Sequence, residues 1–159
     1  MKSLIIDKFV RPWEGTPTKE TAPGCPSKKL EVSVIFTDAP GTLAALKTAG
    51  TLAQGLGAKI KLMDLQAVPY AYPLDRPPVS VAFTEKHLFD LACRAVQASQ
   101  EIAVSLHLCR DRLQTILEVL EPNSLVVIGA RKRWWPTAET RLARALRSRG
   151  HQVVFIDLK

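Results

Sequence analysis

The chain has 159 residues, of which 47% are hydrophobic and 23% are charged, a composition typical of one folded domain with a substantial core. No apolar run approaches the roughly 20 residues that a membrane-spanning helix needs, so we expect no membrane span and a cytoplasmic location. The three cysteines, Cys25, Cys93 and Cys109, fit neither a disulfide framework nor a zinc site. We therefore expect reduced thiols and no bound metal.

The formal net charge is +7, and most of the excess lies near the end of the chain. Between Arg131 and Arg149 there are seven basic residues and one acidic residue, Glu139. Over the helical part of this run, a solvated helix face explains the charge as well as a binding surface does. Nucleic acid is the least favoured partner. The helix that carries these arginines must also supply an apolar face to the core, and no sheet with aromatic residues for base stacking accompanies it.

Residues 1–29 contain four prolines and two glycines but few apolar residues, so we predict an extended N-terminal tail. Its apolar residues, Leu4 to Ile6 and Phe9-Val10, would allow the first ten residues to dock on the domain or on a partner subunit. Residues 30–159 are predicted to form one domain of alternating strands and helices.

The first half of this domain begins with a predicted strand at 32–36 and a helix that ends at Gly57, where a left-handed residue suits a helix C-terminus. A second strand at 59–65 leads into a proline-rich loop from Val68 to Val79. Thr84 is the predicted N-cap of the next helix. The alternating residues at 102–109 indicate a third strand near a sheet edge.

The second half contains a short helix around 113–120, a fully apolar strand at 125–128, a helix opened by Pro136 and Thr137, and a last strand at 152–157. Alternation of strands and helices with right-handed crossovers predicts an α/β fold with a parallel five-stranded sheet between two layers of helices. In such sheets, ligands bind at the carboxyl ends of the strands.

Three local sequences, in this order, resemble the universal stress protein family: Thr37-Asp38 after the first strand, residues 55–62 leading into the second, and residues 124–131 closing the fourth. The resemblance covers about residues 30–159. It implies an adenine-nucleotide alpha-hydrolase-like three-layer sandwich with strand order 3-2-1-4-5. It also implies a nucleotide crevice between the first and fourth strands.

The ATP-binding pattern of that family is only partly present in this chain. Asp38 matches the aspartate that ends the first strand, and Gly129 matches the first glycine after the fourth. Lys132, Leu142 and Ala143 stand where the resemblance implies a second glycine, a third glycine and a Ser or Thr. Because glycines let backbone N–H groups approach phosphates, these replacements argue against the usual mode of ATP binding.

The remaining residues still suggest a nucleotide or anion site at the carboxyl edge of the sheet. Asp38 could accept hydrogen bonds from a ribose or base, or cap the following helix, and these roles are compatible. The three consecutive cations could bind phosphate in place of the lost backbone donors. The full predicted set is Asp38, Ala39, Asp64, Gly129, Ala130, Arg131, Lys132 and Arg133.

No catalytic signature can be read from the residue spacing. His107 and Cys109 share one face of a predicted strand, but two ligands do not make a metal site. Trp134 and Trp135 favour packing or an interface over stacking on a base. We therefore expect a protein that is not an enzyme.

The last strand is apolar on both faces although the strand order implied by the resemblance places it at an edge, which invites association. The resemblance implies dimers formed through this strand, and we predict a homodimer interface at Val153, Val154, Phe155 and Ile156.

Two functional hypotheses remain open. The first is a non-catalytic regulatory protein of the universal-stress type, with a degenerate ATP loop, that acts through a protein partner or a non-ATP anion. The second is a sensor that binds an adenine nucleotide, such as ATP, AMP or a cyclic dinucleotide, in the crevice between the first and fourth strands.

Overall fold

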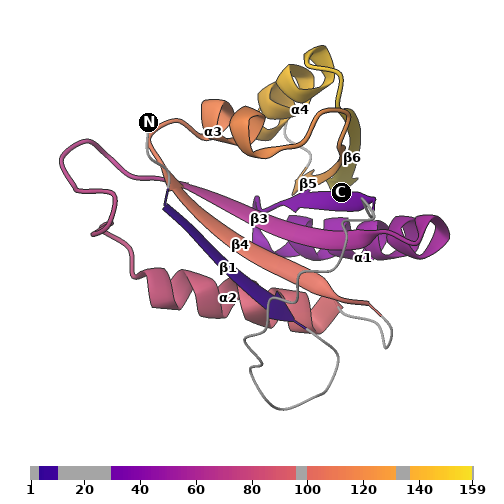
Figure 1. Ribbon diagram of the computed structural model, residues 1–159, viewed down its shortest axis with the longest axis horizontal. Helices are drawn as coiled ribbons and strands as arrows, with labels where there is room; N and C mark the ends of the chain where they lie inside the picture. The colour runs from indigo at the N-terminus through magenta and orange to yellow at the C-terminus, as the bar shows by residue number, and fades with distance from the viewer. Residues whose placement is uncertain (1–3, 11–29, 96–99, 132–136, 159) are drawn as a thin grey trace, which may run out of the picture.

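The computed structural model describes residues 4–10, 30–95, 100–131 and 137–158 and shows a six-stranded sheet between two pairs of helices (Figure 1). Helices α1 and α2 lie below the sheet in this view, and α3 and α4 lie above it. The elements in chain order are β1 (Leu4–Val10), β2 (Glu31–Ile35), α1 (Ala39–Leu56), β3 (Lys59–Ala67), α2 (Val81–Ala95), β4 (Ile102–Cys109), α3 (Arg112–Val119), β5 (Leu125–Arg131), α4 (Ala138–Ser148) and β6 (Gln152–Leu158).

The five strands after β1 confirm the predicted α/β topology. They are all parallel and lie in the order β4-β3-β2-β5-β6, which is 3-2-1-4-5 when these five are numbered along the chain. The strand order reverses at β2, so β3 and β5 lie on either side of it. The carboxyl end of β2 is therefore the topological switch point at which α/β sheets bind ligands.

Strand β1 extends the sheet beyond the predicted five strands. It pairs antiparallel with β4 along its whole length, from Leu4 opposite Leu108 to Val10 opposite Ile102. Residues 102–109 were expected near a sheet edge, and β4 is indeed the last parallel strand, but β1 covers its free side. The rest of the segment predicted as a tail, residues 11–29, lies outside the described part of the chain.

The two faces of the sheet carry separate hydrophobic clusters. Side chains of α1 and α2, such as Leu46 and Leu88, pack with Val34 and Leu62 on one face. On the other face, Ile116 of α3 and Leu146 of α4 pack with residues of β2, β3 and β5. Both faces of the sheet are therefore covered by helices. A ligand site is expected at the ends of the strands, which the helices do not cover.

The helix ends follow the capping chemistry of the sequence with one exception. Gly57 has φ +61° and closes α1 as predicted, and Thr137 accepts a hydrogen bond from the Thr140 N–H at the start of α4. The prediction of Thr84 as the N-cap of α2 is wrong. The helix begins at Val81, and the Ser80 hydroxyl accepts from the Phe83 N–H, because serine is also a good N-cap and lies one turn earlier.

No helix in the described ranges is both long enough and apolar enough to cross a membrane.

Candidate functional site

Asp38 follows β2 at the switch point and caps α1. Its backbone is extended (φ −133°, ψ 167°), and its Oδ1 accepts a hydrogen bond of 2.7 Å from the Gly41 N–H. Its Oδ2 lies 3.5 Å from Nε of Arg131 at the end of β5. Both side chains of this pair are well exposed, so the ion pair contributes at most about 1 kcal/mol. Two predicted site residues, Asp38 and Arg131, are therefore together, and each partly neutralises the other.

The main chains of α1 and β5 are in direct contact beside this pair. An ideal Cβ on Gly129 would lie 2.0 Å from the Gly41 carbonyl oxygen, and one on Gly41 would lie 2.5 Å from the Gly129 carbonyl oxygen. The Thr37 hydroxyl also donates a hydrogen bond to the Gly129 carbonyl oxygen. We call this contact of Thr37, Gly41 and Gly129 the glycine junction. Here the missing side chain of Gly129 permits close packing against α1.

The first turn of α1 offers few donors to an anion. Pro40 has no N–H, and the N–H groups of Gly41 and Thr42 are bonded to the side chain and the carbonyl oxygen of Asp38. The carboxylate of Asp38 also places a negative charge at the positive end of the helix dipole. The features that usually make a helix N-terminus an anion site are therefore occupied by the protein itself.

Asp64 of β3 is only 8% exposed and lies opposite Leu106 of β4. Burial raises the pKa of its carboxyl group, and this effect outweighs the opposing influence of Arg112, the Leu65 backbone and His87. Within the described part of the chain, no ion pair joins Asp64 to Arg131. Asp64 follows Met63, whose carbonyl oxygen accepts a hydrogen bond of 2.8 Å from the Phe36 N–H, so it lies on the strand beside the end of β2 but has no ion pair with the predicted cation there.

This raised pKa predicts a pH dependence of stability that Asp64→Asn should remove. The folded carboxyl group holds its proton above the ordinary pKa of 3.8, so its contribution to stability is present in acid and is lost as pH rises through the folded pKa. We expect the stability of Asp64→Asn relative to wild type to increase from acidic to neutral pH in urea denaturation. The exposed Asp75→Asn is the control, and an equal pH trend in both variants would contradict the assignment.

The other predicted site residues fall into three groups. Ala39 is the first residue of α1, and Ala130 of β5 is 5% exposed and opposite Asp157 of β6. Arg131 is exposed and reaches Asp38. Lys132, Arg133, Trp134 and Trp135 lie outside the described residues, so their predicted roles stay predictions.

His107 and Cys109 are both buried on β4. Nε2 of His107 lies 3.3 Å from the Ser105 hydroxyl, and Sγ of Cys109 donates to the Gln66 carbonyl oxygen. Ser105 and His107 are each only 1% exposed, so this serine and histidine pair lies within the packed sheet. Among the residues placed by the structure, no three His, Cys, Asp or Glu side chains form a metal-binding group.

The proline-rich loop between β3 and α2 is held by Arg110, a residue whose role the sequence did not indicate. Its Nη1 donates to the carbonyl oxygens of Val68 (2.8 Å) and Pro69 (2.6 Å), and its Nη2 to that of Tyr72 (2.9 Å). Its guanidinium group also lies 4.9 Å from the centre of the Tyr70 ring. The loop projects from the carboxyl end of β3, at the left of Figure 1.

The predicted dimer strand, β6, pairs with β5 and with no other described strand. Val153, Val154, Phe155 and Ile156 are half-buried, and Arg147 of α4 donates to the Val153 carbonyl oxygen at 3.1 Å. This hydrogen bond involves one carbonyl group of β6. An edge strand with further free backbone groups can pair with a second copy, so the homodimer remains our prediction. Light scattering at micromolar concentration should give the mass of a dimer, and the mass of a monomer would contradict it.

Comparison with protein-family models and with curated proteins finds no match to this chain.

Proposed function

We propose that this protein is a non-catalytic regulatory protein of the universal-stress type that does not use ATP in the manner of that family. It acts through a protein partner or a non-ATP anion. The observation that carries the proposal is the glycine junction beside the switch point. There Gly129, the residue that matches a phosphate-loop glycine, packs against the main chain of Gly41 in α1.

The electrostatics of the junction support the same proposal. A triphosphate would need several backbone donors and a surplus of positive charge. Asp38 accepts the hydrogen bond of the Gly41 N–H. It also forms an ion pair with Arg131, which is the one cation of the predicted nucleotide or anion site within the described residues. Binding of ATP here would therefore have to displace a helix cap and an ion pair.

Native mass spectrometry of the purified protein, before and after addition of ATP, AMP and cyclic di-AMP, tests the proposal. We expect the bare protein under every condition. One nucleotide retained per subunit would overturn the proposal and favour the sensor hypothesis, with the ligand identified by its mass. In that event, Lys132→Ala should abolish nucleotide binding, because the sensor hypothesis assigns the phosphate contacts to the cations after β5.

A further inference from the structure

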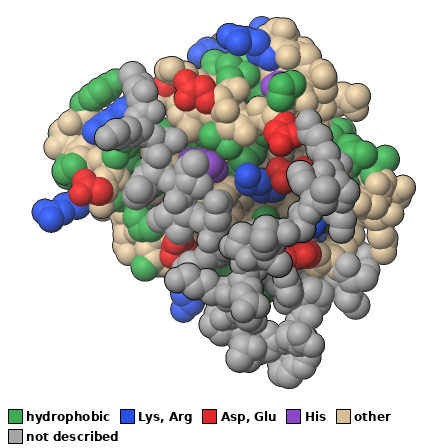
Figure 2. All heavy atoms as spheres, viewed as in Figure 1, with side chains coloured by type: hydrophobic (Ala, Val, Ile, Leu, Met, Phe, Trp, Pro, Cys, Tyr) green, Lys and Arg blue, Asp and Glu red, His purple; other side chains and the backbone are tan. Residues whose placement is uncertain are grey.

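We propose that the outward side of α4 binds an acidic segment of a partner protein. Arg141 and Arg144 lie one turn apart on the exposed side of the helix, opposite the buried residues Ala143 and Leu146, and Arg149 is exposed at its C-terminus. We call Arg141, Arg144 and Arg149 the arginine face. Figure 2 shows Lys and Arg side chains gathered at the top of the molecule, where Figure 1 places α4.

The arginine face does not serve the stability of its own helix. Arg141 is the fourth residue of α4, near the positive end of the helix dipole, where a cation is unfavourable. It is also three residues from Arg144, a spacing at which like charges repel. Among the residues that the structure describes, no carboxylate lies within ion-pair distance of Arg141, Arg144 or Arg149. The local electrostatic cost is therefore uncompensated within the described chain.

Arg147 differs from the three residues of the face. Its Nη2 donates to the Val153 carbonyl oxygen, so it has a structural role at the edge of β6. One arginine of this region therefore forms a hydrogen bond within the domain, whereas the three residues of the arginine face are exposed to solvent.

The choice of residue type points to carboxylate recognition. The chain contains as many lysines as arginines, yet α4 and its C-cap carry four arginines and no lysine. A solvated surface needs only charge, which lysine supplies equally well. Arginine adds a planar pair of donors that binds a carboxylate or phosphate in bidentate fashion.

Charge and shape favour an acidic protein segment over nucleic acid. Nucleic-acid binding without sequence specificity depends on many phosphate contacts, and the arginine face offers three cations on one short helix. Helix α4 also has no aromatic residue on which a base could stack. Three arginines spread over about 12 Å along the helix axis match the carboxylates of a short Asp- and Glu-rich segment.

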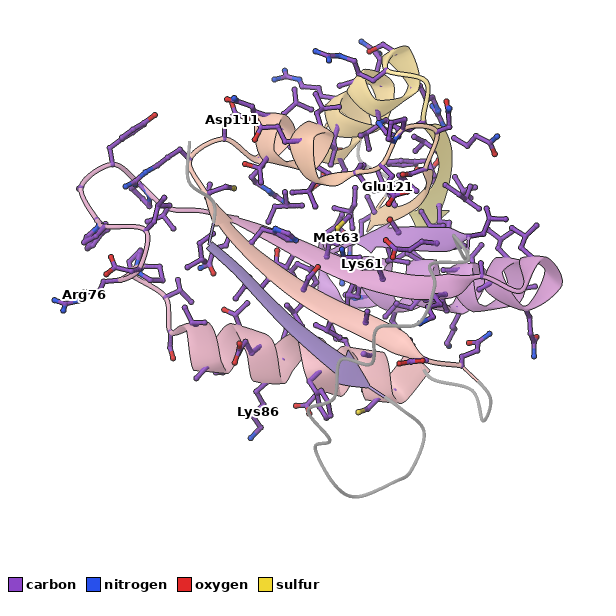
Figure 3. The ribbon with its side chains drawn as sticks, in the orientation of Figure 1. Lys61, Met63, Arg76, Lys86, Asp111 and Glu121 are labelled. Carbon is purple, nitrogen blue, oxygen red and sulfur yellow. The ribbon has the colours of Figure 1, made fainter. Side chains whose placement is uncertain are left out.

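The proposal rests on the proposed function only in that a regulatory protein needs a partner. Its test compares two variants that change net charge equally, Arg141→Glu with Arg144→Glu and Arg76→Glu with Lys86→Glu. Figure 3 shows Arg76 on the loop before α2 and Lys86 on the outer side of α2, both on other parts of the molecule than α4. All four side chains are exposed, and glutamate near the start of α4 is favourable, so both variants should fold.

The probes are a short polyglutamate peptide, a polyglutamine peptide of the same length and an oligothymidylate of the same charge as the polyglutamate. Binding is followed by amide chemical shifts at about 0.15 M ionic strength, where general attraction between exposed charges is screened. We expect polyglutamate to shift amides of α4 selectively. The α4 variant should bind at least about tenfold more weakly, whereas the Arg76 and Lys86 variant should bind nearly as well as wild type.

Three results would overturn this inference: no binding of polyglutamate, equal loss in both variants, or stronger binding of oligothymidylate than of polyglutamate through α4. The last result would assign the arginine face to nucleic acid. None of these bears on whether the glycine junction excludes ATP, because that is measured on the wild-type protein with nucleotides alone.

Discussion

Replacing Gly129 with alanine should lower the free energy of unfolding by about 3 kcal/mol or more, because the new Cβ has no space. It would lie 2.0 Å from the Gly41 carbonyl oxygen, and this neighbour is main chain within a capped helix. Relief would require α1 to move away from β5, against the packing of Ala45, Leu46 and Ala49 in the core. Urea denaturation followed by circular dichroism measures the loss.

Gly55→Ala is the matched control. Gly55 lies in the same helix as Gly41, and a Cβ there would meet no described heavy atom within 4 Å. Alanine should therefore raise stability by about 0.5 to 1 kcal/mol, since it lowers the entropy cost of forming the helix. Wild-type stability of Gly129→Ala would show that the junction is open enough to hold another group.

Arg110→Ala should release the loop between β3 and α2 and cost about 2 kcal/mol. The guanidinium group donates to three carbonyl oxygens and lies over the Tyr70 ring, and hydrogen bonds from charged groups are the stronger kind. Chymotrypsin cleavage after Tyr70, which is 80% exposed, should accelerate by about tenfold, because cleavage follows the population of the opened loop.

Arg76→Ala tests whether any arginine of this region has the same effect. Arg76 lies on the same loop and is exposed, and its backbone N–H donates a hydrogen bond to the Pro73 carbonyl oxygen. We expect wild-type stability and cleavage rate for this variant. Equal rates of cleavage in Arg110→Ala and Arg76→Ala would show that the loop is held by its prolines alone.

The parallel sheet could be predicted because each of its strands and helices has its own local pattern. The apolar run at 125–128 and the alternation at 102–109 appear in the sequence where β5 and β4 lie in the structure. Strand β1 could not be placed in the same way. Its pairing with β4 joins residues about a hundred positions apart, and a short apolar run among polar residues does not show whether it docks or where.

The sequence indicated which residues lie at the carboxyl edge of the sheet, but it did not indicate what those residues do there. Asp38 and Gly129 match positions of a nucleotide site, the first for a ribose or base and the second for phosphate. In the structure Asp38 caps α1 and Gly129 is in close contact with that helix. A sequence pattern cannot distinguish a phosphate-binding glycine from a packing glycine, because glycine allows the backbone to approach a phosphate and a helix equally closely. Arg110 was missed because its partners lie some forty residues away and are backbone atoms.

The most direct test of the proposal that the switch point does not bind ATP is an amide spectrum of the wild-type protein titrated with magnesium ATP. Gly41 and Gly129 report on the junction from both sides, because each packs against the main chain of the other. We predict that both amide signals stay in place up to millimolar nucleotide. Saturable shifts of both signals would show that ATP enters the junction, and would contradict the account given for this protein.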